Sequence, residues 1–299
     1  MTQLRTRKAR PFLKWAGGKR QLLSQIDGYL PRALKNGAMQ RYVEPFVGSG
    51  AVFFHVVQTY PVKELFIADI NSELILAYRT IEQEVEALIT ELAQIEERYL
   101  PLSEQKRKAY YYRQRDIYNK DKAVIDYDTF QEAWVKRAAQ LIFFNKTSYN
   151  GLFRVNSRGE YNVPFGRYKN PTICDGPNLR AVSDILGRTQ IHFGPYTLCA
   201  DVIDDNTLVY FDPPYRPISD TANFTAYSPH SFDDPQQLAL ADFYRHLNEQ
   251  GAYLMLSNSD PKNNDPSDDF LEKAYEGFRI ERVQARRRIN RSADKRGPI

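Results

Sequence analysis

The stretch between residues 41 and 69 constrains the fold of this chain more than any other. Residues 41–46 are predicted to form a short strand, the Gly48-Ser49-Gly50 loop follows, and residues 51–58 have helical character. A second apolar strand, 64–68, ends at the acidic Asp69. Strand, glycine loop, helix, strand and acid in this order are typical of the first half of a nucleotide-binding α/β unit. We therefore expect an α/β fold.

A second strand-to-loop junction carries the most informative chemistry. The run 207–211 is apolar, β-branched and aromatic, which predicts a buried strand, and Asp212-Pro213-Pro214-Tyr215 follows it. The prolines stiffen the backbone and supply no N–H, so this turn cannot continue a sheet ladder. It places a carboxylate and backbone carbonyls beside a flat ring, which suits a planar amine such as the amino group of a nucleobase. The alternative is a rigid strand exit with a surface tyrosine.

Helical periodicity dominates the middle of the chain. Apolar residues recur at three- and four-residue spacing from residue 72 to about 141, with an irregular stretch at 110–118, and residues 130–144 predict another helix. Residues 145–171 form a polar, aromatic loop region with weak strand signals. The remaining predicted elements are helices at 179–186 and 238–247 and strands at 191–193, 252–256 and 278–285.

These elements predict a sheet domain in two sequence-separated parts with a largely helical insert. The expected sheet domain comprises residues 1–71 and 171–299, and the insert comprises residues 72–170. In open α/β sheets, ligands bind beyond the carboxyl ends of the strands. Four residues at predicted strand ends can therefore converge on one crevice: Phe46, Asp69, Asp212 and Ser257.

Composition excludes several classes of protein. No apolar run among the 299 residues is long enough to cross a bilayer, and the basic N-terminus lacks the apolar segment of a signal peptide. Cys174 and Cys199 make neither a disulfide framework nor a metal site, which fits a reducing cytoplasm. The four histidines have no ligand spacing, so we expect no metal.

The distribution of charge favours a polyanionic partner. The net charge of +4 decides little alone, but basic residues gather near both ends and in a central group interleaved with aromatics. These residues are Arg5, Arg7, Lys8 and Arg10, then Arg154, Arg158, Arg167 and Lys169, and finally Arg286, Arg287, Arg288, Arg291, Lys295 and Arg296.

Two strand-end features suggest a nucleoside-containing cofactor. Gly48 and Gly50 permit close backbone approach, because glycine lacks Cβ and tolerates positive φ. Asp69 lies where an acidic side chain can bind ribose hydroxyls. The alternative for the two glycines is a plain strand–helix turn. The alternative for Asp69 is a carboxylate that the helix dipole favours at the start of a helix.

A resemblance to a phosphate loop fails at two positions. Gly17-Gly18-Lys19 matches the end of that loop, but Leu13 stands in place of its first glycine and Arg20 in place of the Mg²⁺-binding Ser or Thr. We therefore reject an NTPase, which leaves an NAD-like cofactor or S-adenosylmethionine.

Several motifs together resemble the Dam-type family of DNA adenine-N6 methyltransferases, from about residue 10 to 296. The motifs are residues 12–19 (FLKWAGGK), 44–50 (EPFVGSG), 68–71 (ADIN), 149–154 (YNGLFR), 161–169 (YNVPFGRYK) and 212–215 (DPPY). The resemblance implies a Rossmann-like class I methyltransferase sheet with an inserted, largely helical DNA-recognition domain that carries a hairpin. It also implies S-adenosylmethionine as cofactor, S-adenosylhomocysteine as product and adenine N6 in GATC as target.

The resemblance assigns roles to individual residues. The cofactor would contact Trp15, Ala16, Gly17, Lys19, Phe46, Gly48, Gly50, Asp69 and Asp212. The target amine would be held by Asp212 and Pro213 in the turn completed by Pro214 and Tyr215, with the Tyr215 ring stacked on the flipped base. Phe224 and Tyr227 are candidates to close over that base, or incidental aromatics of a surface loop.

Double-stranded DNA would be read by the motifs of the insert. Arg154 would bind a guanine edge, Leu152 and Pro164 would contact thymine methyl groups, and Lys14 would reach an outer base pair. Tyr149 and Asn150 would fill the space around the flipped base, and Arg167, Tyr168 and Lys169 would lie near the backbone. Phosphate contact for Arg154 and hairpin packing for Leu152 are the alternatives.

Three other functions share parts of this pattern. An RNA or protein methyltransferase would share the cofactor site, a cytosine-N4 methylase would use similar chemistry on another exocyclic amine, and a non-catalytic DNA-binding module would need no cofactor residues. We expect a cytoplasmic monomer without membrane contact. The biological role, in genome maintenance, restriction-modification or a phage, stays open.

Overall fold

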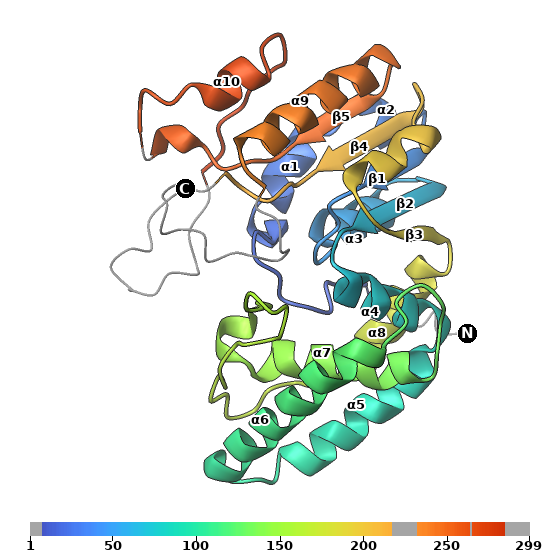
Figure 1. Ribbon diagram of the computed structural model, residues 1–299. Helices are drawn as coiled ribbons and strands as arrows, with labels where there is room; N and C mark the ends of the chain where they lie inside the picture. The colour runs from blue at the N-terminus through green and yellow to red at the C-terminus, as the bar shows by residue number, and fades with distance from the viewer. Residues whose placement is uncertain (1–7, 217–231, 264, 285–299) are drawn as a thin grey trace, which may run out of the picture.

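Five parallel strands form the centre of the molecule in the computed structural model, which describes residues 8–216, 232–263 and 265–284 (Figure 1). They run in the order β3-β2-β1-β4-β5 across one sheet. Their bounds are β1 (Arg41–Glu44), β2 (Glu64–Asp69), β3 (Thr189–Phe193), β4 (Thr207–Phe211) and β5 (Tyr253–Leu256). The order reverses direction between β1 and β4, and such a switch point opens a crevice at the carboxyl ends of the strands.

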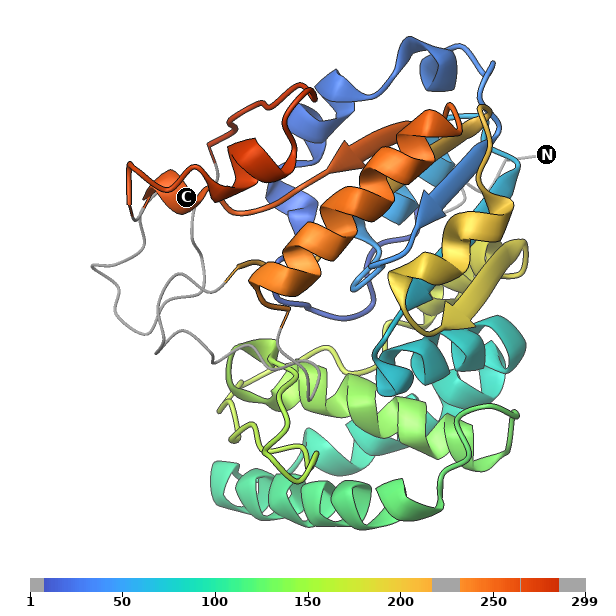
Figure 2. The same cartoon turned by 45° about the horizontal axis from the view of Figure 1, so that its top comes forward.

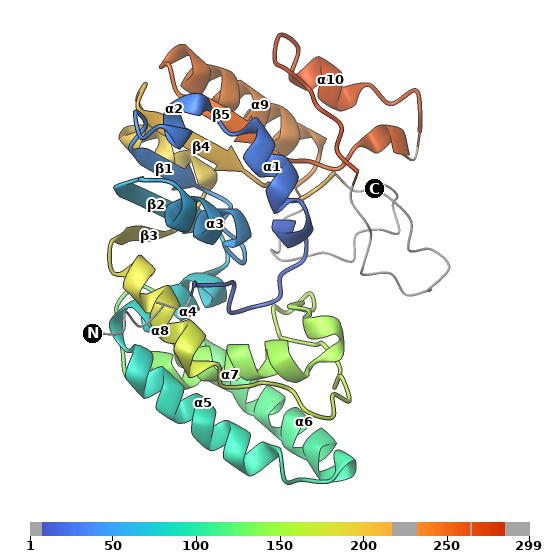
Figure 3. The ribbon, with the colours of Figure 1, turned by 180° about the vertical axis from the view of Figure 1, so that it is seen from behind.

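Helices cover both faces of this sheet. Figures 1 and 3 show α9 (Asp234–Glu249) on one face and α1 (Leu23–Tyr29) with α3 (Ala51–Thr59) on the other. Strand residues alternate between these layers, since Tyr42 packs in the cluster with α3 and Val43 in the cluster with α9. The remaining short helices are α2 (Arg32–Lys35) and α10 (Phe270–Ala274).

A second, helical layer adjoins one edge of the sheet. It contains α5 (Val85–Tyr99), α6 (Glu104–Asp121) and α7 (Ala133–Thr147), which lie side by side in Figures 1 and 2. Two helices connect it to the sheet, α4 (Ser72–Gln83) and α8 (Gly176–Leu186), and α4 packs against both β3 and α7. No helix in the described ranges is long and apolar enough to cross a membrane.

The α/β prediction is confirmed, while one local prediction is wrong. The stretch with irregular periodicity, 110–118, lies inside the continuous helix α6 (Glu104–Asp121), where Tyr111 and Tyr118 are the two buried residues. Residues 278–284 of the predicted strand 278–285 pair with no strand. They are mostly exposed, and Arg282 forms ion pairs instead with Asp260 and Glu272. An alternating pattern yields a strand only where a partner ladder exists.

A buried ion pair joins the helical layer to the start of α4. The Arg137 Nε donates to Glu73 at 2.9 Å, and another guanidinium nitrogen contacts the second carboxylate oxygen. The Tyr127 hydroxyl donates to the same carboxylate at 2.6 Å, and the guanidinium lies 3.3 Å from the Tyr118 ring centroid. Every charge is therefore paired, as a buried ion pair requires.

Replacing Arg137 by methionine is expected to lower the free energy of unfolding by about 3–5 kcal/mol, because Glu73 would be left buried without a cation. Urea denaturation measures the effect. Lys136→Met is the matched control, since Lys136 is exposed and pairs with Asp121 at 3.3 Å, a contact worth about 0–1 kcal/mol. Equal destabilisation by the two variants would contradict a structural role for the buried pair.

Candidate active site

The glycine loop and the Asp212 turn lie beside each other at the switch point. The loop follows β1 and the turn follows β4, and these two strands pair directly, with Val43 opposite Val209. Asp69 ends the strand on the other side of β1, and Ser257 donates its backbone N–H to the Phe211 carbonyl at 2.9 Å. The four predicted strand ends therefore lie along one edge of the sheet.

Lys19 and Asp212 form an ion pair at the centre of this edge. The Lys19 side chain is 3% exposed, its ammonium contacts the Asp212 carboxylate, and it donates to the Gly17 carbonyl at 2.9 Å. It also lies 4.8 Å from the Tyr215 ring centroid. Burial opposes a charge on Lys19, but Asp212 and Tyr215 outweigh it and raise the pKa of the ammonium. Burial raises the pKa of Asp212, against the opposing effect of Lys19.

A second buried carboxyl, Glu44, lies at the end of β1. It accepts a hydrogen bond from the Tyr42 hydroxyl at 2.7 Å, and burial raises its pKa well above the usual range. Asp212 adds to this rise and Lys19 opposes it, so the three groups share one electrostatic environment. The burial of Glu44 beside Asp212 and Lys19 could not be predicted from the sequence, where it stands as a strand residue before Pro45.

The Asp69 carboxylate organises the glycine loop from the neighbouring strand. It accepts from the Gly48 N–H at 3.0 Å and from the Asn71 N–H at 2.9 Å. The Tyr78 hydroxyl donates to the Gly48 carbonyl at 3.1 Å. Burial, partly offset by these N–H donors, raises the pKa of Asp69 to about 6. The loop backbone is therefore fixed from both sides.

Two half-buried aromatic side chains flank the loop. Trp15 stacks on Phe153 with ring centroids 5.5 Å apart, and it packs so close to the loop that a Cβ on Gly48 would lie 3.1 Å from its ring. Phe46 stacks on Tyr196 at 5.3 Å. Ala16 is also half-buried and Gly17 is exposed, with φ of 75°. Partly exposed aromatic faces beside a glycine loop suit an adenosyl group.

Gly50 begins α3 in the left-handed region, with φ of 69°. A Cβ there would lie 2.8 Å from the Tyr78 hydroxyl and 3.0 Å from Phe54. Gly50→Ala is expected to cost about 1–3 kcal/mol of unfolding free energy and to weaken S-adenosylmethionine binding. Thermal unfolding with and without the cofactor measures both effects.

The matched control for that prediction is Gly28→Ala. Gly28 lies within α1, and nothing lies within 4 Å of its added Cβ. This change is expected to stabilise the protein by about 0.5–1 kcal/mol. A Gly50→Ala protein that unfolds and binds cofactor like the parent would contradict the packing described for the loop.

The N-terminal motif also touches the recognition loop of the insert. The Asn145 side chain accepts from the Lys14 N–H at 2.7 Å, and it donates to the Lys14 and Gly151 carbonyls at 2.7 and 2.9 Å. The exposed Lys14 ammonium lies 5.2 Å from the Tyr168 ring centroid. Asn145, which the sequence did not single out, therefore fixes Lys14 against the predicted DNA-reading loop.

The predicted recognition hairpin is present as two isolated antiparallel bridges, Ser148–Phe165 and Val155–Tyr161. Arg154 lies beside the second bridge, where its Nε donates to the Asn162 side chain at 2.8 Å. The two terminal guanidinium nitrogens have no bonding partner within the described ranges. A guanidinium group that is fixed through Nε, with its two terminal nitrogens available to a ligand, is suited to bidentate recognition of a base edge.

The other predicted DNA-contacting residues surround this hairpin. Tyr149 is 49% exposed and donates its N–H to the Pro164 carbonyl at 2.8 Å, and Asn150 has φ of 56°. Leu152 is half-buried, Pro164 is exposed, Arg167 is exposed with φ of 56°, Tyr168 is half-buried and Lys169 is exposed. A guanidinium nitrogen of Arg107 donates to the Lys169 carbonyl at 2.6 Å, which ties this segment to α6.

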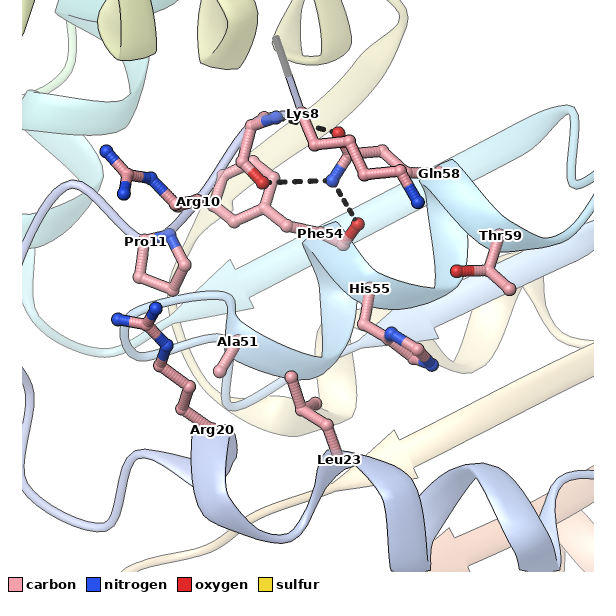
Figure 4. Close-up of a pocket in the computed structure, with 11 residues that line it drawn as sticks. Lys8, Arg10, Pro11, Arg20, Leu23, Ala51, Phe54, His55, Gln58 and Thr59 are labelled. Atoms are coloured by element: carbon pink, nitrogen blue, oxygen red, sulfur yellow. Dashed lines mark hydrogen bonds between the residues drawn. The ribbon is translucent and has the colours of Figure 1, made fainter.

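A separate hollow lies on the outer side of α3 (Figure 4). Its walls include Arg10, Arg20, Phe54, His55 and Gln58. None of the predicted catalytic or cofactor residues lines it, so this hollow is separate from the candidate site at the strand ends. Phe224 and Tyr227, the predicted closing aromatics, lie outside the described residues, as do the basic residues at 5, 7 and 286–296.

A glycine loop and an Asp-Pro-Pro-Tyr turn at the switch point of a parallel sheet define an α/β methyltransferase. A family model described as D12 class N6 adenine-specific DNA methyltransferase matches residues 15–289, and the chain belongs to this family. The resemblance inferred from the sequence is thus confirmed, and adenine N6 in DNA, rather than cytosine N4 or RNA, is the family's target. The family's methyltransferases use S-adenosylmethionine.

Full-length relatives support this assignment. The chain is 49% identical over 289 residues to the type II methyltransferase M.MjaIII of Methanocaldococcus jannaschii, covering 97% of this chain and 96% of that protein. It is 36% identical over 292 residues to the type II methyltransferase M1.LlaDCHI of Lactococcus lactis, covering 97% and 93%. It is 34% identical over 293 residues to the DNA adenine methylase of Escherichia coli K12, covering 98% and 94%.

Proposed function

We propose that this enzyme transfers a methyl group from S-adenosylmethionine to the N6 of an adenine flipped out of duplex DNA, with GATC as its target. The observation that carries the proposal is the position of the Asp212 turn. It lies next to the glycine loop at the switch point, so one crevice can hold the cofactor and the target amine together. Flipping is required because N6 cannot be reached inside a duplex.

The cofactor is proposed to bind around the glycine loop. Gly48 and Gly50 allow close approach of the ligand to the backbone, and Trp15 and Phe46 offer partly exposed ring faces. The remaining cofactor contacts proposed are Ala16, Gly17, Lys19, Asp69 and Asp212. When bound, the cofactor supplies an electrophilic sulfonium methyl group.

Asp212 and Pro213 would orient the target amine. The lone pair of N6 is delocalised into the adenine ring, which makes it a poor nucleophile. A carboxylate and a carbonyl that accept its two N–H groups bring the nitrogen toward tetrahedral geometry and align it with the methyl group, and alignment can contribute about 7–11 kcal/mol. Lys19 holds the Asp212 carboxylate in place, and Tyr215 stacks on the base.

The helical insert, residues 72–170, would form the DNA target-recognition domain. Arg154 is proposed to read a guanine, Leu152 and Pro164 to contact thymine methyl groups, and Lys14 to reach an outer base pair. Tyr149 and Asn150 would lie around the flipped base, and Arg167, Tyr168 and Lys169 would position the DNA backbone. Their exposed or half-buried positions around one hairpin support this arrangement.

A radiolabelled methyl-transfer assay tests the proposal. The substrates are a duplex oligonucleotide with one GATC, a duplex of the same composition with that site permuted to GTAC, and the single strand of each. We expect label in the GATC duplex, recovered as N6-methyl-2′-deoxyadenosine after digestion to nucleosides. Equal labelling of the permuted duplex would contradict GATC recognition, and preference for single strands would contradict recognition of a duplex.

A further inference from the structure

The catalytic turn is held by side chains at almost every residue. Asp212 contacts Lys19, the Pro214 carbonyl accepts from Gln237, and Arg216 donates to both carboxylate oxygens of Asp234 at 2.6 and 2.8 Å. Among the residues that the structure describes, none donates a hydrogen bond to the carbonyl of Pro213. This carbonyl follows the Asp212 carboxylate in the chain and can therefore accept from a ligand.

Gln237 links this turn to α9 and to the loop that follows β5. It is completely buried in the first turn of α9, and its Nε2 donates to the Pro214 carbonyl at 3.0 Å. Its Oε1 accepts from the Asn258 side chain at 3.1 Å. Asn258 follows β5, and its own Oδ1 accepts from the Ser259 N–H at 2.9 Å. Both ends of the Gln237 amide are therefore used, and its orientation is fixed by the network.

We infer that Gln237 is a positioning residue for methyl transfer. By holding the Pro214 carbonyl, it fixes the rotation of the Pro214–Tyr215 peptide group, and the proline ring, which locks φ of Pro214, limits the rotation of the preceding Pro213–Pro214 group. The free Pro213 carbonyl and the Asp212 carboxylate then face the same amine. The inference rests on the proposed role of the Asp212 turn and adds a residue from α9 to it.

A hydrogen-bond donor from another helix is needed here for a physical reason. Two consecutive prolines supply no N–H groups, so the turn cannot be fixed by a backbone ladder of its own. Loss of the Gln237 donor would also leave the Pro214 carbonyl without a partner. A shift of about 1 Å in aligned reactants can cost about 100-fold in rate.

The test is Gln237→Glu, which preserves the shape of the side chain. An ionised carboxylate cannot donate to the Pro214 carbonyl, whereas a protonated one can donate to Pro214 and still accept from Asn258. We expect kcat at about pH 8 to fall about 100-fold, with KM for DNA and Kd for S-adenosylmethionine near parental values. The ratio of variant to parental kcat should rise as the pH falls toward about 6, because burial raises the pKa of a carboxyl group.

The pH dependence of this ratio separates positioning from a general structural defect. Both enzymes contain the same ionisable groups at the turn within the described residues. These groups are Lys19, Glu44, Asp212, Tyr215 and Arg216, together with Asp234 and Asp268, which pair with Arg216. Their titration therefore largely cancels in the ratio. A variant that loses cofactor affinity and thermal stability in parallel with kcat, with no recovery at lower pH, would overturn the inference.

Gln236→Glu is the matched control. Gln236 is exposed, and its side chain accepts from the Asp233 N–H at 3.2 Å, a role that glutamate also fulfils. The control adds the same charge one residue away and should retain parental kcat. Parental kcat in Gln237→Glu, combined with an inactive Asp212→Ala enzyme, would overturn this inference alone. Activity in Asp212→Ala would overturn the proposed site itself.

Discussion

Asp212→Ala is expected to abolish methyl transfer while the enzyme still binds duplex DNA. The carboxylate is the charged group of the turn at the switch point, and its removal leaves the target amine without one of its two acceptors. We expect kcat to fall by at least about 1,000-fold, the upper range for removing one preorganised group from an active site. Single-turnover methyl transfer and a DNA-binding titration measure the two properties separately.

The structure also predicts a cost of this change outside catalysis. Lys19 is 3% exposed and would lose the carboxylate that pairs with it, so some loss of stability is expected. The control is Asp205→Ala, because Asp205 is exposed in the turn before β4, at the opposite end of that strand. It should leave kcat and DNA binding unchanged. Retained turnover in folded Asp212→Ala enzyme would overturn the mechanism.

Arg154→Ala is expected to weaken methylation of cognate DNA by about 1–3 kcal/mol in kcat/KM and to relax specificity at one base pair. The physical reason is the orientation of its guanidinium. Asn162 holds Nε at 2.8 Å, and the two terminal nitrogens can then meet the two acceptors of a guanine edge. Competition between GATC duplexes and singly substituted duplexes measures the specificity.

The competition assay distinguishes a base contact of Arg154 from a phosphate contact. Loss of a phosphate contact weakens activity equally on all sequences, whereas loss of a base contact penalises only the cognate one. Arg158→Ala is the matched control, because Arg158 is 78% exposed at the tip of the same hairpin and pairs with Glu160 at 3.0 Å. Equal loss on all sequences in Arg154→Ala would make Arg154 a phosphate anchor.

The sequence predicted those parts of the fold that depend on local order. The glycine loop between two apolar strands, and the apolar run before Asp212, specify strands and loops through neighbouring residues alone. All four strand ends singled out from the sequence lie along one edge of the sheet. The candidate site residues could also be predicted from neighbouring residues, because each motif is a contiguous stretch of sequence.

Features set by distant residues could not be predicted in this way. The predicted strand is absent from residues 278–284 because an alternating pattern does not reveal whether a partner strand is present. Three side chains with structural or positioning roles escaped notice for a related reason. Asn145 and Gln237 lie outside the quoted motifs, and their partners lie on other elements of the fold. Glu44 lies in the 44–50 motif and bonds Tyr42 of the same strand, but its burial beside Asp212 and Lys19 depends on the folded sheet.

A crystal structure with S-adenosylhomocysteine and a GATC duplex would test the proposed geometry of methyl transfer. We expect the target adenine to be rotated out of the helix and stacked on Tyr215, with N6 within hydrogen-bonding distance of the Asp212 carboxylate and the Pro213 carbonyl. The cofactor should lie against the Gly48–Gly50 loop. An adenine that stays stacked in the duplex, or a flipped base bound away from Asp212, would contradict it.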